Sequence, residues 1–239
     1  PWCIGIDSGV ATGWVATDWI ERLMLRTAPP EDYDAWVAGE LPFTSDQVKN
    51  AAELMSDIWL NPDYVLGGTD QLVTEAIQDS PVHMFEDPPT CWMHVQASWV
   101  QGFFPEDAEP GVDYDFFYFP QVDPAYGEPV LMAGDIMTLL VDKPEAKALL
   151  EYLSTGASME LFMRNGAALS PHQDSDTAWY QSEIDTRQGE ILLNAEIVRF
   201  DGGDLMPPEV GTGTFWSAMV DYVSGTVDLD TAMQEIDDS

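Results

Sequence analysis

Short apolar runs alternate with helix-like segments along this chain, and this alternation restricts the fold more than any other feature. The apolar runs are candidate strands at 3–6, 82–85, 116–120 and 129–140, the last broken by Gly134 and Asp135. Between them, apolar residues recur every three or four positions, which is the spacing of a helix with one buried face. Strands that alternate with helices are typical of α/β domains. The sequence therefore predicts an α/β fold.

Cap spacing and apolar stripes predict where the helices lie. Asp18 and Glu21 have the spacing of a helix cap, and a similar signal begins at Thr44. Pro144 has the position expected of proline in the first turn of a helix. Residues 28–42 are interpreted as an acidic connector. The predicted helices run over about 18–26, 44–59, 70–78, 90–101, 143–154, 158–164, 186–194, 214–224 and 228–236.

The acidic charge excludes several classes of partner. The 239 residues carry 8 Lys+Arg against 43 Asp+Glu, which gives a formal net charge of -35. Nucleic acid would meet a surface of its own sign, and so would an anionic membrane. Disordered acidic chains are poor in aromatic residues, whereas this chain has 9 Trp and is 45% hydrophobic. We therefore expect a folded core and no nucleic-acid partner.

The same charge bears on the environment of the protein. The only lysines are Lys49, Lys143 and Lys147. Repulsion among carboxylates at this density destabilises the compact state unless salt screens it, and halophilic surfaces are built in this way. Two explanations stay open at this point: a salt-adapted source, or a general acidic bias in an exported protein.

No sequence motif predicts a cofactor, a metal or a catalytic centre. Dinucleotide, phosphate-loop, zinc-protease and serine-hydrolase motifs are absent, and two cysteines cannot form a Cys-only zinc site. His83, which lies in an apolar run, is interpreted as a core histidine. The segment from Asp201 to Asp204 is similar to part of a calcium loop but lacks its remaining ligands, so a simple turn is expected. Carboxylate pairs could serve a glycoside hydrolase, although 43 acidic residues supply pairs by chance.

Aromatic and small polar residues gather where predicted elements meet. They comprise Thr12, Gly13 and Trp14, the 88–92 turn with Pro89, Thr90 and Trp92, Gly134 with Asp135, and Trp216 at the start of a late helix. In open α/β sheets, ligands bind outside the carboxyl ends of the strands. Sugars stack their C–H faces on aromatic rings and offer hydroxyls to carboxylates and amides. The set favours a sugar site, while core packing remains the alternative for each Trp alone.

These positions also resemble a known family. The N-terminal run PWCIGIDSG, continued by ATGW and ATDW, comes before PVLMAG, KPEA, LLEYLS, GAALSP, MPP and FW in the same order. This order is similar to the second half of extracellular solute-binding proteins of carbohydrate ABC importers, the maltose-binding-protein superfamily, and especially to its α-glucoside-binding branch. The resemblance covers almost the whole chain and lies in the order and spacing of the segments.

The resemblance implies a two-lobed protein that closes on a sugar by hinge motion. Residues 1–134 and 176–239 would form the second, C-terminal lobe of a type II periplasmic-binding-protein fold, and 135–175 would be a helical segment that crosses to a missing first lobe. It implies a monomer without enzymatic activity or cofactor, which delivers its sugar ligand to the membrane subunits of an ABC importer. Pro1 is not an initiator, so we expect a periplasmic or extracellular parent whose beginning was removed, with a lipid anchor there as one means of attachment.

The resemblance also implies roles for particular residues. Trp216 corresponds to the aromatic platform, and Thr12, Gly13 and Trp14 correspond to loop contacts. The family's Pro-Trp turn falls on 88–90, where Trp is replaced and Trp92 lies nearby. Val220 stands where a basic residue is usual, which favours a smaller glucoside over maltodextrin. The full predicted ligand set is Thr12, Gly13, Trp14, Pro89, Thr90, Trp92, Gly134, Asp135 and Trp216.

Two further expectations follow from an exported lobe. Cys3 and Cys91 lie at strand-associated positions of one lobe, so oxidation to a disulfide is expected, with two buried free thiols as the alternative. Asp135 interrupts an apolar strand at the crossing between lobes, so we expect it to accept sugar hydroxyls. Three other functions remain open: a sensor domain of the same fold, a glycoside hydrolase, and a structural acidic surface protein.

Overall fold

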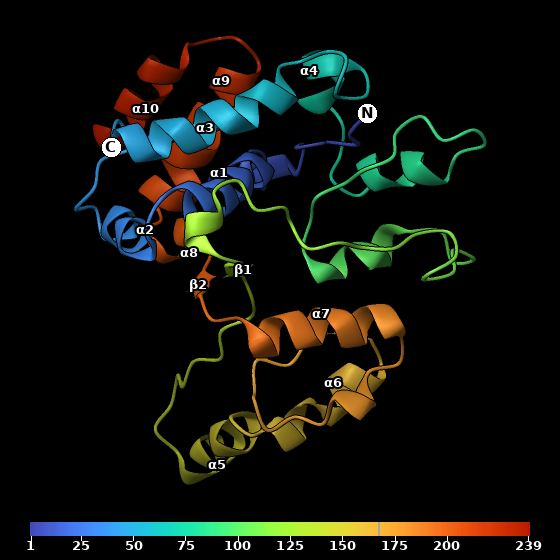
Figure 1. The fold of residues 1–239 in the computed structure, drawn as a ribbon. Helices are drawn as coiled ribbons and strands as arrows, with labels where there is room; N and C mark the ends of the chain where they lie inside the picture. The colour runs from blue at the N-terminus through green and yellow to red at the C-terminus, as the bar shows by residue number, and fades with distance from the viewer. Residues whose placement is uncertain (167) are drawn as a thin grey trace.

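The computed structural model describes residues 1–166 and 168–239. Residues 1–132 and 198–239 form a helical body, and residues 133–197 form a smaller module that lies below it in Figure 1. Two short strands connect the parts: β1 (Val130–Met132) leaves the body and β2 (Val198–Phe200) returns to it. Both connections between body and module therefore lie side by side.

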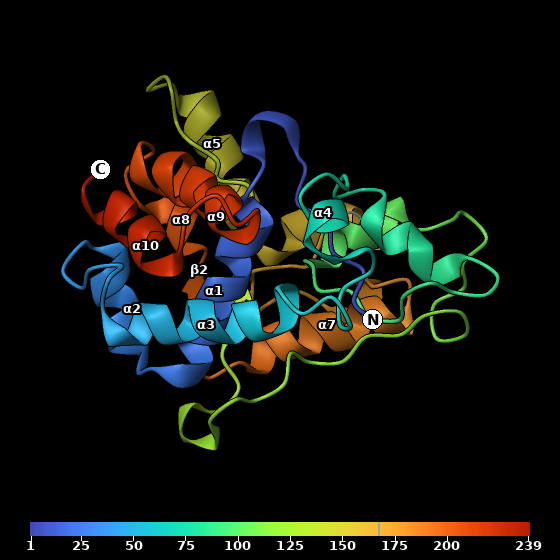
Figure 2. The same ribbon diagram turned by 90° about the horizontal axis from the view of Figure 1, so that it is seen from above.

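The body is built around α1 (Trp14–Thr27). This helix packs against α3 (Asp46–Trp59) and α9 (Phe215–Val223), with α2 (Pro30–Val37) beside it and α10 (Leu229–Asp237) against α9, an arrangement visible from above in Figure 2. Trp19, Trp36 and Trp59 are each at most 1% exposed. Their rings meet neighbours edge to face, for example Trp19 and Trp59 with centroids 5.7 Å apart. Burying rings of this size supplies much of the hydrophobic stabilisation of the body.

The start of α1 corrects one sequence prediction. The helix begins at Trp14, four residues before the predicted cap, because Gly13 adopts a φ of +114° that ends the preceding loop. Asp18 and Glu21 are consequently interior residues, and both are buried. Their carboxylates make tertiary contacts instead of capping the helix.

The sheet is much smaller than predicted. β1 and β2 pair in parallel, with Val130 opposite Val198, and they are the only two strands among the described residues. Residues 3–6 are extended, but only isolated bridges flank them, such as Trp2 with Val65. The fold is therefore mixed and helix-rich with a small sheet. This is compatible with the α/β class, without the predicted series of strands.

Two other predicted strands are wrong. Residues 82–85 lie in a 3-10 helix (Ser80–Phe85), which Pro81 favours by fixing its own φ in the first turn. Residues 116–120 have no regular structure, and Phe117 is 66% exposed. Apolar composition at these positions marks contact with neighbours rather than a strand backbone.

Six of the predicted helices lie close to their predicted positions. α5 (Pro144–Leu153), α6 (Glu160–Arg164) and α7 (Glu183–Asn194) lie within a few residues of their predicted positions, as do α3, α9 and α10. α4 (Gly68–Leu72) is shorter than predicted, and residues 90–101 hold only the start of a 3-10 helix, η3 (Ser98–Phe103). The predicted connector contains α2, and α8 (Gly202–Leu205) with a π-helical turn (Val210–Thr214) was missed.

Cys3 and Cys91 form a disulfide, as predicted. Their Cα atoms are 5.4 Å apart, and the two cysteines are 88 positions apart in sequence. The backbone N–H of Cys3 donates to the carbonyl of Met93 at 2.7 Å, and that of Trp92 donates to Pro1 at 2.9 Å. The bond therefore fastens the N-terminal segment to a second extended segment of the body.

Candidate ligand-binding site

The loop before α1 and the start of α9 are in direct contact. A Cβ on Gly13 would lie 2.4 Å from the backbone oxygen of Trp216, and φ at Gly13 is in the left-handed region, so only glycine fits here. Phe215 is fully buried, whereas Trp216 and Trp14 are partly exposed. Three predicted ligand residues, Gly13, Trp14 and Trp216, are thus brought together.

A further tryptophan extends this aromatic group. The rings of Trp14 and Trp99 have centroids 5.9 Å apart and are tilted by 48°. Trp99 is the second residue of the 3-10 helix η3, is 45% exposed, and meets Phe103 edge to face at 5.4 Å. Half of the Trp99 surface therefore stays free for a ligand.

A groove of 260 Å³ lies beside Trp99, between the body and the module. Ser98, Gln101 and Gly102 line it from the body, and Gly166, Ala168, Leu169, Tyr180 and Asp185 line it from the module. Gln101 donates to a carboxylate oxygen of Asp185 at 3.2 Å and accepts from the Tyr114 hydroxyl at 2.9 Å. The groove thus combines aromatic rings with a carboxylate and an amide.

Glycine also positions the module side of this groove. A Cβ on Gly189 of α7 would lie 2.5 Å from the Tyr180 ring, so α7 approaches this ring only because position 189 is glycine. The Tyr180 hydroxyl accepts the backbone N–H of Ser170 at 3.0 Å, and burial raises the pKa of this hydroxyl. Tyr180 is therefore held in one orientation as a neutral ring.

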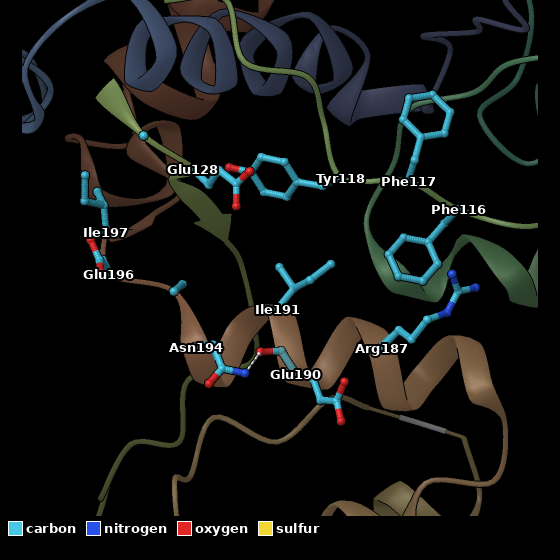
Figure 3. Close-up of a pocket in the computed structure, with 12 residues that line it drawn as sticks. Phe116, Phe117, Tyr118, Glu128, Arg187, Glu190, Ile191, Asn194, Glu196 and Ile197 are labelled. Atoms are coloured by element: carbon cyan, nitrogen blue, oxygen red, sulfur yellow. Dashed lines mark hydrogen bonds between the residues drawn. The ribbon is translucent and has the colours of Figure 1, made fainter. Parts of the chain in front are cut away.

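A larger groove of 840 Å³ runs along α7 (Figure 3). Phe116, Phe117 and Tyr118 line one side, and the α7 residues Arg187 and Ile191 line the other. The Arg187 guanidinium lies 4.8 Å from the centre of the Phe116 ring and pairs with Asp115. None of the nine predicted ligand residues lines the larger groove or the smaller one, but the smaller one is lined by Trp99, whose ring meets that of Trp14.

The remaining predicted residues do not line either groove. Thr12 accepts from Ser8 N–H at 3.0 Å and lies 2.8 Å from the Gly9 carbonyl, so it holds its own loop. Pro89 is partly exposed and Trp92 is 66% exposed. Gly134 and Asp135 lie in an exposed segment without regular structure, so Asp135 does not interrupt a strand as predicted.

Thr90 belongs to a separate cluster around His83. The Thr90 hydroxyl donates to Glu86 at 2.7 Å, and Glu86 and Glu75 lie 2.8 and 3.0 Å from the two ring nitrogens of His83. The hydrogen bond to Glu86, followed by that to Glu75, raises the pKa of His83. The interpretation of His83 as a core histidine is therefore wrong, because its ring is partly exposed between two carboxylates.

Sequence reasoning missed Trp99, Gln101, Tyr180 and Asp185. Each aromatic ring of this group has an amide close by in sequence, Gln101 after Trp99 and Gln181 after Tyr180, and that pattern was a usable signal. The pairing of Asp185 with Gln101 joins residues 84 positions apart, so only the fold reveals it. Over the residues that the structure describes, no group of three or more His, Cys, Asp or Glu could hold a metal ion, and no helix is long and apolar enough to cross a membrane.

Comparison with known proteins finds binding proteins that are similar to this chain. No family model matches the sequence, and no solved structure matches it. Two curated binding proteins, however, match nearly the whole chain. These matches confirm the resemblance drawn from the sequence.

The relatives are known by name. The osmoprotective compounds-binding protein GgtB of Synechocystis sp. is 44% identical over 225 residues, which are 94% of this chain and 53% of that protein. The alpha-glucosides-binding periplasmic protein AglE of Rhizobium meliloti is 45% identical over 234 residues, which are 97% of this chain and 51% of that protein. The chain therefore spans about half the length of the curated relatives it matches.

Proposed function

We propose that this chain is the C-terminal portion of the substrate-binding component of a sugar ABC importer. It captures an α-glucoside or a similar small oligosaccharide in the periplasm or outside the cell, and hands it to the membrane subunits of the importer without chemical change. The observation that carries this proposal is the groove beside Trp99, where aromatic rings, a carboxylate and an amide face each other between body and module.

The chemistry of this groove suits a sugar. Trp99 offers an exposed ring face for the C–H surface of a pyranose, and Asp185 and Gln101 offer hydrogen-bonding groups for its hydroxyls. Tyr180, which is 8% exposed, forms part of the groove wall. Asp185 and Gln101 bond to each other in this structure, so a hydroxyl would exchange with that bond. The names of the two relatives, an α-glucoside binder and an osmoprotectant binder, agree with a small polar ligand.

Trp14 and Trp216 would extend the aromatic surface beyond Trp99. Both are partly exposed and both adjoin Gly13. Val220, one turn beyond Trp216, adds no charge there. We therefore propose that Trp216 is a platform on which the sugar stacks. We also propose that the protein prefers a small glucoside to a long maltodextrin.

We also propose that the module belongs to a first lobe, and that the protein closes by motion about β1 and β2. The exposed apolar side chains of the module support this: Ile136 is 74%, Leu140 89% and Leu161 70% exposed. Large apolar side chains exposed to this extent are accounted for if another part of the protein covers them. The family resemblance placed the return of the chain to the second lobe at residue 176. Because α7 packs with the rest of the module, we place this return at β2 instead.

A sugar panel tests the proposed function. The full-length protein is mixed with α-glucosides, other disaccharides and small osmoprotectants, and its melting temperature is recorded. We expect a rise with at least one α-glucoside, because a ligand that binds only the folded state stabilises it. Chromogenic glucosides are incubated in parallel. Steady release of the chromophore would replace the proposal with a glycoside hydrolase, and the absence of any sugar-induced shift would refute it.

A further inference from the structure

A fully buried carboxyl group joins α1 to the segment that follows β2. One oxygen of Glu21 accepts the backbone N–H of Gly202 at 2.7 Å, and the other accepts that of Gly203 at 2.9 Å. These glycines open α8 directly after the return strand. A Cβ on Gly202 would lie 2.9 Å from the Tyr33 hydroxyl, so glycine is what allows this close approach.

The Tyr33 hydroxyl, which comes from α2, lies between Glu21 and β2. It is 3.1 Å from a carboxyl oxygen of Glu21 and 2.9 Å from the backbone carbonyl of Phe200. The hydroxyl has one proton to donate, and a carbonyl can only accept. Both contacts can be hydrogen bonds at once only if Glu21 is protonated. Tyr33 then donates its proton to the Phe200 carbonyl, and the Glu21 carboxyl donates a hydrogen bond to the Tyr33 oxygen.

The charged groups around Glu21 favour the protonated form. Asp18 acts on it from α1 and Asp201 from the residue before α8, and Asp204 in turn acts on Asp18 and Asp201. The cation of this cluster, Arg22, is paired with Asp18 at 3.1 Å. Burial first, and then the charges of Asp201 and Asp18, raise the pKa of Glu21 well above its usual range, although the two glycine N–H groups oppose this.

We propose that Glu21, Tyr33 and the Phe200 carbonyl form a proton-dependent tie between the body and the return strand β2. With Glu21 protonated, the chain of hydrogen bonds runs from α1 through α2 to β2. When Glu21 loses its proton, the Tyr33 hydroxyl turns to the carboxylate and the bond to Phe200 is lost. Because β2 is one of the two connections to the module, the surrounding pH then sets how firmly that connection is held.

Amide hydrogen exchange of the full-length protein tests the tie, and it needs no sugar. Protection factors of residues 198–204, corrected for intrinsic exchange, are compared between pH 5 and pH 9. We expect protection to fall about tenfold or more with rising pH in the native protein. Glu21→Gln cannot ionise, so residues 198–201 should keep the same protection at both values. Gly202 and Gly203 are left out of this comparison, because one of their two N–H groups would face the Gln amide nitrogen, which cannot accept a hydrogen bond.

Two tyrosine variants complete the test. Tyr33→Phe removes the relay and should show low protection at both pH values, while Tyr64→Phe, at a half-exposed tyrosine of the body, should behave as the native protein does. If Glu21→Gln does not fold, Tyr33→Phe alone decides. Protection that is independent of pH in the native protein would overturn the proposal, as would the same pH-dependent fall in Glu21→Gln or Tyr33→Phe.

Discussion

Helix α1 of the body and helix α5 of the module are buried to very different extents. Of the 14 residues of α1, all those from Val15 to Glu21 and from Leu23 to Arg26 are buried, whereas none of the 10 residues of α5 is buried. Both helices contain apolar stripes, so the sequence alone does not distinguish them. The difference shows that α1 lies inside the core of the body, while α5 presents its apolar residues outward and the module buries only a few, such as Met163 and Ile184. The following predictions test this contrast, beginning with the largest effect.

The disulfide should contribute most to the stability of the body. Reduction of Cys3–Cys91, whose cysteines are 88 positions apart, should lower the free energy of unfolding by about 4–5 kcal/mol in the loop-entropy model. Denaturant unfolding with and without reductant measures this. Thiol titration of the denatured, unreduced protein is the control, and two free thiols there would contradict the bond.

Two leucines provide a matched comparison of body and module. Leu25 is 0% exposed in α1 and Leu161 is 70% exposed in α6. Leu25→Ala should destabilise the 239-residue chain by about 2–5 kcal/mol, because it leaves a cavity, and Leu161→Ala should change it by less than about 0.5 kcal/mol. Urea unfolding measures both. Equal costs would mean that the body and module do not differ in packing.

Asp201 should make the stability of the body depend on pH. Burial raises the pKa of Asp201 to about 6 in the folded protein. The stability that the protonated carboxyl allows is fully present below the pKa of Asp201 in the unfolded chain, and it is lost as the pH rises through about 6. Asp201→Asn, which can still cap α8, should match the native protein near pH 4 and exceed it by up to ~3 kcal/mol at pH 8. Urea unfolding at both pH values measures the difference, and a gap that does not grow with pH would count against the shifted pKa.

Salt should have a smaller and more general effect. At a net charge of -35, raising ionic strength from about 0.01 M to about 1 M shortens the screening length from about 30 Å to about 3 Å. Repulsion among carboxylates should then fall and the melting temperature should rise by several degrees. A melting temperature that stays constant over this range would contradict a salt-adapted surface.

Local signals in the sequence predicted local structure. Pro144 placed α5, and the helical pattern over 228–236 placed α10. Strands failed because apolar runs such as 116–120 do not report whether another strand lies beside them. The family resemblance, which lies in the order of the sequence segments, placed Gly13 and Trp216 in one predicted ligand set, and the structure brings them into contact. Tyr180 and Asp185 were missed because only the fold brings them close to Trp99.

Calorimetric titration of the full-length protein with the α-glucoside that stabilises it tests the central claim most directly. Trp99 and Trp92 are both exposed tryptophans of the body, but only Trp99 lines the groove. Trp99→Ala should weaken binding by at least about 2 kcal/mol, or about thirtyfold, because it removes a stacking ring, and Trp92→Ala should leave the affinity unchanged. Unchanged affinity in Trp99→Ala, or an equal loss in Trp92→Ala, would contradict a site in this groove.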